Sequence, residues 1–304
     1  MIRAPGPRLP AATRLGRVRL AVADLERSVA FYRRVLGLSV RDTTDDRAAL
    51  GAEGTDEMLV ELHEHPNAAP IPRRGRLGLF HFALLLPDRP ALGRFLRHLG
   101  DVGVRPGASD HLVSEALYLN DPDGLGIEVY ADRPRSEWRE RNAELVMTTE
   151  PLDLESLLEA GAKGDGRGTG GARDDGARDG LPAGTTVGHV HLHVGDLERA
   201  AAFYHEALGL DITVRGYPGA LFLSAGGYHH HLGVNTWAAG AARAGEGDAR
   251  LLDWELILPT VGDAATALGA LEAAGHQVDR DAGGGSARDL WGTALRIVAE
   301  TRRA

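Results

Sequence analysis

The amino-acid sequence predicts an α+β fold in which one βαβββ unit occurs four times in tandem. The main evidence is an internal repeat: residues 16–27 (GRVRLAVADLER) and 188–199 (GHVHLHVGDLER) match, and both continue into Ala-Phe-Tyr and Leu-Gly-Leu at the same offset. Such self-similarity indicates one supersecondary unit used repeatedly. Each repeat opens with alternating residues, which is typical of a strand, and then reaches a residue that can cap a helix.

The first unit shows the plan most clearly. An alternating strand surrounds Leu20, and Asp24 then caps an amphipathic helix that runs through Tyr32. Gly37 ends this helix. Three short strands are expected next, at 38–42, 48–52 and 58–63.

The other three units follow the same order. In the second, a strand begins at residue 79, a helix covers 90–99, and strands follow near Val104, at 115–119 and at 126–130. The third unit runs from residue 186 to about 237, and the fourth from 251 to 298.

These units divide the chain into two halves. Residues 14–132 hold the first pair of units, 133–184 form a linker, and 185–300 hold the second pair. Within the linker a short helix is expected at 152–158. The following stretch, 161–180, is rich in Gly, Asp and Arg and almost free of apolar residues, so we expect it to be disordered.

Composition excludes several classes of function. The net charge of -9 argues against a nucleic-acid partner, and the absence of cysteine excludes thiolate metal sites. No apolar run approaches the roughly 18 residues that span a bilayer, and the N-terminus lacks the apolar core of a signal peptide. We therefore expect a cytoplasmic protein without a membrane partner. The sequence is compatible with a homo-oligomer and does not fix the number of copies.

Four tandem βαβββ units with these local sequences resemble the vicinal oxygen chelate superfamily. The resemblance covers nearly the whole chain outside the linker and the termini. It implies that the units pair and that each pair curls into an open barrel around a metal. The expected architecture is thus two open barrels, the glyoxalase/extradiol dioxygenase fold.

The spacing to the helix cap indicates which residues could bind the metal. His81 precedes Asp88 by seven residues, and His189 precedes Asp196 by seven. The same position holds Arg17 in the first unit, and in the fourth it holds Asp253. Two of the four equivalent positions therefore carry histidine. His191 and His193 share a strand face with His189 and compete with it for this role, but both break the spacing.

A carboxylate completes the candidate metal site. Glu128 follows an Asp-Pro-Asp-Gly turn, and strand alternation places it opposite Ile127 and Val129. The fourth unit has Arg296 instead, which cannot bind a cation. Two histidines and one carboxylate on one face of a metal are typical of non-haem Fe(II) oxygenases. The sequence thus predicts His81, Glu128 and His189 as ligands of Fe(II).

This ligand set requires the second unit to pair with the third. The more common pairing in the family, one with two and three with four, would separate His189 from the other ligands. Glu61 could then complete a glyoxalase-type site with His81 and Glu128. We favour the pairing of two with three, because it alone assembles the full triad.

The stretch 111–128 resembles the extradiol ring-cleavage dioxygenase signature, although Ser109 departs from the residue types preferred two positions before its histidine. The resemblance implies that Glu128 is the iron ligand and that His111 and Tyr118 surround the catechol oxygens. Residues 228–231 read Tyr-His-His-His. Matching them to the family pattern selects His230 as the acid or base that assists O2 activation, although a bulge would turn a neighbouring histidine inward.

The implied function is that of a non-haem Fe(II) extradiol dioxygenase, similar to catechol 2,3-dioxygenases, that cleaves a catechol-type ring with O2. Its partners would be a small aromatic diol and O2. Two alternatives stay open: a glyoxalase-type metal-dependent isomerase or lyase, and a non-enzymatic small-molecule-binding member of the superfamily. Iron content together with O2 consumption would separate them.

Overall fold

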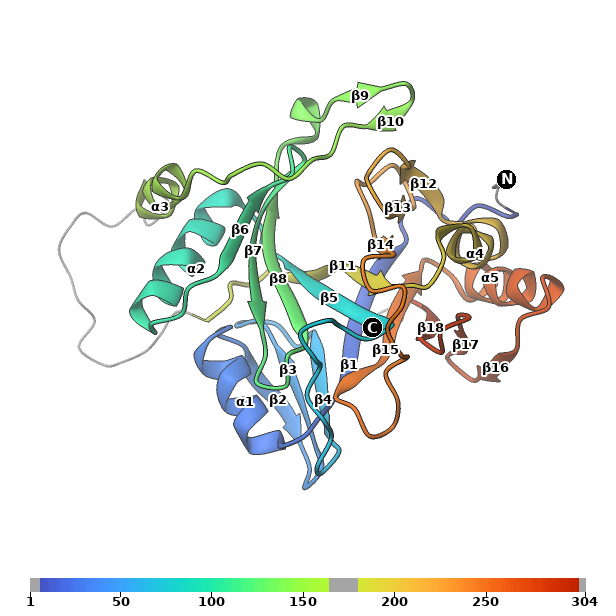
Figure 1. Ribbon diagram of the computed structural model, residues 1–304, viewed down its shortest axis with the longest axis horizontal. Coiled ribbons are helices and arrows are strands. Elements are labelled where there is room, and N and C mark those ends of the chain that lie inside the picture. Colours follow the sequence, from blue (N-terminus) through green and yellow to red (C-terminus); the bar gives the residue numbers. More distant parts are fainter. Residues whose placement is uncertain (1–5, 164–179, 301–304) are drawn as a thin grey trace.

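The structure, a computed structural model, describes residues 6–163 and 180–300. It contains two eight-stranded sheets (Figure 1). In spatial order, the first sheet consists of β16 (Val278–Asp281), β17 (Gly284–Arg288), β18 (Ala294–Ala299), β15 (Arg250–Leu258), β1 (Arg14–Val22), β4 (Val60–Glu64), β3 (Arg47–Gly51) and β2 (Ser39–Thr43). The second consists of β12 (Asp211–Val214), β13 (Ala220–Ser224), β14 (Leu232–Asn235), β11 (Thr186–His193), β5 (Gly78–Leu85), β8 (Gly126–Asp132), β7 (Ser114–Asn120) and β6 (Gly107–Asp110).

The strand order shows which units pair. In the first sheet β1 runs antiparallel to β15, which joins the first unit to the fourth. In the second sheet β5 runs antiparallel to β11, which joins the second unit to the third. The predicted α+β class and the predicted pairing of two with three are both confirmed. Each sheet draws on both halves of the chain, so the boundaries 14–132 and 185–300 divide the chain by sequence and not into separate sheets.

One helix follows the first strand of every unit. These helices are α1 (Leu25–Arg34), α2 (Arg89–Asp101), α4 (Leu197–Ala201), which continues as a π-helical turn over Ala202–Ala207, and α5 (Val261–Ala273). Asp24, Asp88, Asp196 and Thr260 cap them by accepting a hydrogen bond from the backbone N–H three residues on. The predicted capping positions are thus confirmed. Among the described residues, no helix is long and apolar enough to cross a membrane.

The tyrosine of each Ala-Phe-Tyr repeat ties two units together. The Tyr32 hydroxyl of α1 donates to Asp121, in the turn before β8, over 3.3 Å. The Tyr204 hydroxyl of the third unit donates to Asp289, in the matching turn before β18, over 2.9 Å. All four side chains are buried. Each helix of units one and three is therefore anchored to a turn of the other sheet.

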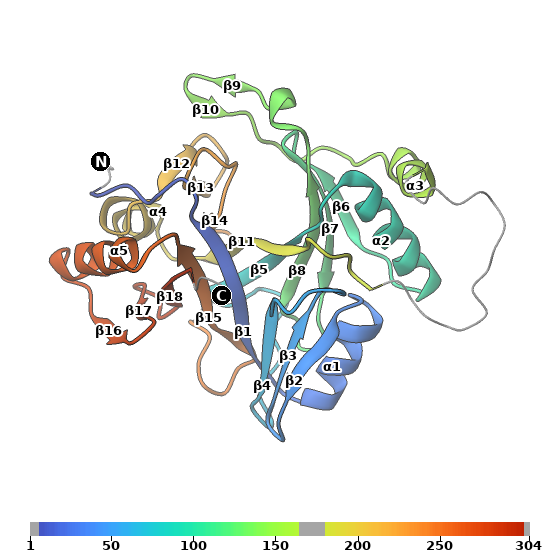
Figure 2. The same ribbon diagram turned by 180° about the vertical axis from the view of Figure 1, so that it is seen from behind.

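The segment after β8, which was expected to be a linker, contains regular secondary structure. It contains a 3-10 turn (Arg135–Glu137), a short hairpin of β9 (Glu140–Arg141) and β10 (Glu144–Leu145), and α3 (Leu154–Lys163). The predicted helix at 152–158 is thus longer, and residues 161–163 are helical rather than disordered. Residues 164–179 of the predicted disordered stretch lie outside the described residues, and its last residue, Gly180, donates its backbone N–H to Glu53 over 3.3 Å. Figures 1 and 2 show α3 lying against α2.

Two glycines allow α2 and α3 to approach closely. A Cβ at Gly93 would press against the backbone of Leu157 and Gly161, and one at Gly161 would press against the backbone around Gly93. Backbone atoms cannot move aside cheaply. The helix pair therefore depends on small residues at this crossing.

Gly93→Ala is expected to lower the stability of the fold by about 1–3 kcal/mol, through overpacking at this crossing. Gly100→Ala is the matched control in the same helix. No atom lies within 4 Å of the added Cβ there, so alanine should stabilise by about 0.5–1 kcal/mol. Thermal unfolding of both variants measures the difference. Equal melting temperatures would show that α3 can shift on α2 without cost.

Candidate metal centre

Strand register positions the two histidines side by side. In β5, Phe82 and Leu84 face the apolar core, and His81 lies on the opposite face. His81 is paired with His191 of β11, but the register shifts between Val187 and His189. This irregularity, at Gly188, places His189 beside Ala83. The bulge thus brings the histidine of the third unit next to that of the second.

Glu128 reaches the same place from the neighbouring strand. β5 and β8 are parallel, with Ala83 paired to Glu128. The turn before β8 is fixed by Asp121, whose Oδ1 accepts the backbone N–H of Asp123 over 2.9 Å and that of Leu125 over 2.8 Å. Gly124 takes a positive φ of 83° in this turn. A rigid turn therefore sets where Glu128 points.

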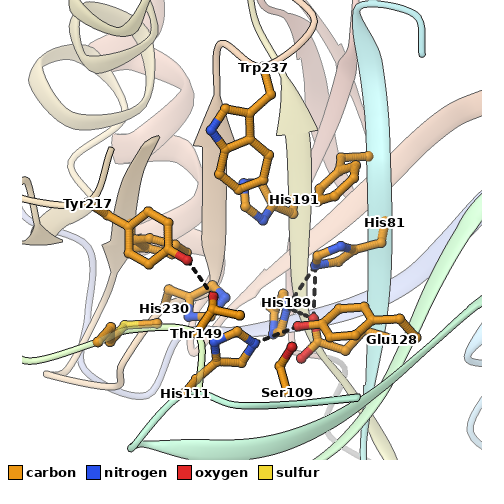
Figure 3. A pocket seen from close by; sticks show the side chains of 14 residues that line it. His81, Ser109, His111, Glu128, Thr149, His189, His191, Tyr217, His230 and Trp237 are labelled. Carbon is orange, nitrogen blue, oxygen red and sulfur yellow. Dashed lines mark hydrogen bonds and ion pairs between the residues drawn. The ribbon is translucent and has the colours of Figure 1, made fainter. Parts of the chain in front are cut away.

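The three predicted ligands converge on one point, as Figure 3 shows. Oε2 of Glu128 lies 3.0 Å from Nε2 of His81 and 3.2 Å from Nε2 of His189. The two Nε2 atoms are 3.3 Å apart. All three residues are at most 5% exposed. In the part of the chain that the structure describes, no other group of three potential ligands converges in this way.

The donor set fits a divalent metal. Ligand atoms about 2.1 Å from one cation lie about 3.0 Å apart at right angles and about 3.4 Å apart in a tetrahedron. The observed separations of 3.0–3.3 Å fall in this range. Nδ1 of His189 is buried without a hydrogen-bond partner among the described residues.

The electrostatics favour protonation states that can bind a metal. Burial lowers the pKa of His189 to about 4, although the carboxylate of Glu128 raises it in part. Burial alone would raise the pKa of Glu128, but the two imidazoles outweigh this effect and hold that pKa well below its usual value. Near neutral pH the site therefore offers a neutral imidazole and an ionised carboxylate, which are the forms that bind a cation.

His111 and Tyr118 form a hydrogen-bonded pair beside the triad, with the Tyr118 ring 5.7 Å from that of His81. Nδ1 of His111 lies 2.7 Å from the carbonyl oxygen of Thr148, which can only accept, so Nδ1 carries a proton. In the neutral ring Nε2 then accepts from the Tyr118 hydroxyl, 2.7 Å away. Burial, with the nearby charge of Glu128, raises the pKa of Tyr118 well above 10. Tyr118 is therefore a neutral donor, and His111 presents a lone pair to it.

The three consecutive histidines lie in an irregular segment just before β14, so strand alternation does not apply to them. His230, which the family pattern selects, lines the cavity described below. His229 lies behind it, with the two Nδ1 atoms 2.7 Å apart. Nδ1 of His231 instead accepts from the backbone N–H of Ala225 over 3.2 Å. Burial, with neighbouring histidines, lowers the pKa of His230 well below its usual value.

All six predicted site residues line one cavity of about 220 Å³. Eight further residues complete its wall. The sequence pointed only to His191 for this site, as a competitor of His189, and gave the others no role there: Phe80, Ser109, Met147, Thr149, His191, Tyr217, Phe222 and Trp237. Thr149 and Tyr217 join through their hydroxyls over 2.6 Å, which connects the segment after β10 to the third unit. The apolar run 145–147 inside a polar segment is the sequence signal that could have revealed this wall.

Comparison with known proteins identifies the family. The sequence-family model of the glyoxalase/bleomycin resistance protein/dioxygenase superfamily matches residues 14–129 and 186–290. The chain belongs to this superfamily. The predicted resemblance is thus confirmed, and both matched segments contain ligand candidates.

Individual relatives give a sharper comparison. A protein of Bacillus subtilis (strain 168) named catechol-2,3-dioxygenase is 46% identical over 271 residues, covering 88% of this chain and 90% of its own. Two solved structures share the superfamily fold at low identity. A putative dioxygenase from Bacillus subtilis has a TM-score of 0.64 at 14% identity, covering 96% of this chain and 86% of its own. Glyoxalase I from Zea mays has a TM-score of 0.52 at 18% identity, covering 95% and 92%.

In this superfamily member the first sheet carries charges where the second carries the triad. Arg17 stands in the position of a histidine, and its guanidinium lies 3.0 Å from Glu61, which stands in the position of Glu128. Nε2 of His63 lies 2.6 Å from the same carboxylate. Asp253 pairs with Arg19. The alternative site of Glu61 with His81 and Glu128 is therefore not formed, because Glu61 belongs to the other sheet.

Proposed function

We propose that this protein is an Fe(II)-dependent extradiol dioxygenase that cleaves a catechol-type ring with O2. The observation that carries the proposal is the convergence of His81, Glu128 and His189 within 3.0–3.3 Å at a cavity that His111, Tyr118 and His230 also line. The name of the 46% identical relative supports the same reaction. Bound to these three ligands, Fe(II) would offer open positions for both catechol oxygens and for O2.

The protein's own part in the reaction includes proton handling. A catechol that binds through both oxygens must lose protons, and a nearby group must accept them. His111 is placed for this role, since its Nε2 lone pair faces the Tyr118 hydroxyl and its Nδ1 is held by a backbone carbonyl. Tyr118 hydrogen-bonds to the substrate oxygen and passes the proton to His111. His230 supplies a second ring at the cavity for a later proton transfer.

The cavity suits a small, flat, uncharged ring. Its volume of about 220 Å³ is below the roughly 300–1,000 Å³ of sites for drug-sized ligands. Three aromatic side chains form part of the cavity wall: Phe80, Phe222 and Trp237. None of the described residues that line it carries a permanent positive charge. A substrate carboxylate would therefore enter without a counter-ion.

We expect 4-methylcatechol to be turned over with a kcat/KM at least about 10²-fold above that of 3,4-dihydroxybenzoate. The two substrates differ only in one ring substituent, which is a methyl group in 4-methylcatechol and a carboxylate in 3,4-dihydroxybenzoate. Desolvation of an unpaired ion costs several kcal/mol, and each 1.4 kcal/mol is a factor of ten. Steady-state kinetics of both substrates measures the ratio. Equal efficiencies would show that a cation reaches the ring substituent.

The reaction itself is tested with anaerobically purified protein loaded with Fe(II) and then supplied with catechol and air-saturated buffer. The proposal predicts consumption of one O2 per catechol and formation of a muconic semialdehyde. Tight binding of catechol without O2 consumption would favour a binding protein. Isomerisation of a 2-oxoaldehyde thiol adduct, with no O2 uptake, would favour a glyoxalase-type enzyme.

A further inference from the structure

A line of hydrogen bonds runs from the cavity to Asp132, the last residue of β8. It begins at His230, whose Nδ1 lies 2.7 Å from Nδ1 of His229. It continues from Nε2 of His229 to Oδ1 of Asp132, over 2.8 Å. His229 is fully buried, whereas the Asp132 side chain is 28% exposed. From the cavity outward, His230 contacts His229, and His229 contacts Asp132.

With both imidazole rings neutral, the kind of each hydrogen-bond partner fixes where the protons lie. A carboxylate only accepts, so Nε2 of His229 must carry the proton that it donates to Asp132. A neutral imidazole has one N–H, which leaves Nδ1 of His229 as an acceptor. The proton between the two Nδ1 atoms then belongs to His230. The remaining atom of that ring, Nε2, is left with a lone pair.

Other side chains contact Asp132 and His229 from outside the cavity. Asp132 ends β8, the strand that also carries Glu128. The Tyr228 hydroxyl donates to the same Oδ1 over 3.2 Å, and the Tyr130 hydroxyl lies 2.7 Å from that of Tyr228. The ring of Trp138 lies against His229, with centroids 5.3 Å apart. Asp132 of β8, in the second unit, thus accepts the hydrogen bond of a histidine ring, that of His229, in the third unit.

We propose that Asp132 and His229 are positioning residues that hold His230 as the Nδ1–H tautomer and present its Nε2 to the cavity as a proton acceptor. Neither residue lines the cavity, so both act only through His230. The tautomer rests on the hydrogen-bond geometry alone, and only its kinetic consequence rests on the proposed dioxygenase function.

The tautomer can be measured without metal or substrate. Nitrogen-15 NMR of metal-free protein labelled at histidine distinguishes protonated from unprotonated ring nitrogens, and His230→Asn identifies the resonances of His230. We expect a protonated Nδ1 and an unprotonated Nε2, with this preference lost in His229→Leu. An Nε2-protonated His230 in the unmodified protein, or a His230 signal that His229→Leu leaves unchanged, would overturn the proposal.

Two substitutions of His229, by Asn and by Gln, distinguish a positioning role of its ring from a role in packing alone. The amide of Asn reaches the place of Nδ1 and can still accept from His230, whereas the amide of Gln reaches the place of Nε2 and cannot. We expect His229→Gln and Asp132→Ala to lower kcat by about 10- to 100-fold, the usual cost of losing an outer-shell partner, with KM and iron content unchanged. His229→Asn should recover most of the lost kcat.

Tyr228→Phe is the control for Asp132. It removes the other hydrogen bond to Oδ1 and leaves His229 its acceptor, so kcat should stay within about threefold of that of the unmodified protein, because the His229 bond persists. Equal losses in His229→Asn and His229→Gln would contradict the positioning role. An inactive but iron-loaded unmodified protein would refute the dioxygenase function instead, and the NMR result would still decide the tautomer.

Discussion

Replacing Glu128 with Gln is expected to abolish iron binding and ring cleavage together. The amide keeps the shape of the side chain but removes the only negative charge among the three converging ligands. Loss of a group that merely supports a ligand costs about 10- to 100-fold in affinity, so loss of the ligand charge should cost more than about 10²-fold. Iron content after anaerobic loading and desalting, measured beside O2 consumption, gives both results.

Glu61→Gln is the matched control for this experiment. Glu61 stands in the equivalent strand position of the other sheet and is equally buried, at 3% exposure. Its partners are Arg17 and His63, so iron content and turnover should be unchanged.

His189→Ala should behave like Glu128→Gln, although His189 lies in the other half of the chain. Full iron occupancy in His189→Ala would refute the proposed ligand set.

Replacing His111 with Phe is expected to leave iron bound and to lower kcat by about 10²- to 10⁴-fold, the range for a lost acid–base group. Phenylalanine keeps a flat ring in the cavity wall but removes both the bond to Thr148 and the acceptor for Tyr118. Single-turnover kinetics with iron-loaded protein measures the loss at the chemical step, separately from substrate binding.

His63→Phe serves as the control, because His63 contacts the equivalent carboxylate of the first sheet and does not line the cavity. It should turn over catechol at the normal rate. Tyr118→Phe should resemble His111→Phe with a smaller loss, since His111 can then contact the substrate oxygen itself. A turnover unchanged in both cavity variants would reassign the pair to packing and leave proton transfer to other groups.

The fold could be predicted because its signals are local and repeated. Alternation, a capping Asp or Thr and a downstream glycine recur in the units, and each acts over a few residues. The histidines were identified because one spacing relates them to the helix caps. The pairing of two with three could then be chosen because the ligand set requires it, and the strand order agrees.

The rest of the cavity depends on contacts that no local pattern encodes. Met147 and Thr149 reach it from an irregular segment whose path is set by the β9–β10 hairpin and by the bond from Thr149 to Tyr217. The role of His229 depends on Asp132, which is 97 residues away in sequence. The strand expected near Val104 begins later, at Gly107, because Gly103 takes a positive φ of 76° after α2 and turns the chain first.

The strand order also affects how the protein can fold during synthesis. β1 and β5 are made in the first half of the chain, but their partners β15 and β11 come from the second. A nascent first half on the ribosome therefore has two open strand edges, which are templates for pairing with another chain. It also holds only His81 and Glu128 of the candidate metal ligands. The three candidate ligands can therefore come together only after β11 has been synthesised, and until then β5 keeps an open edge that another chain could pair with.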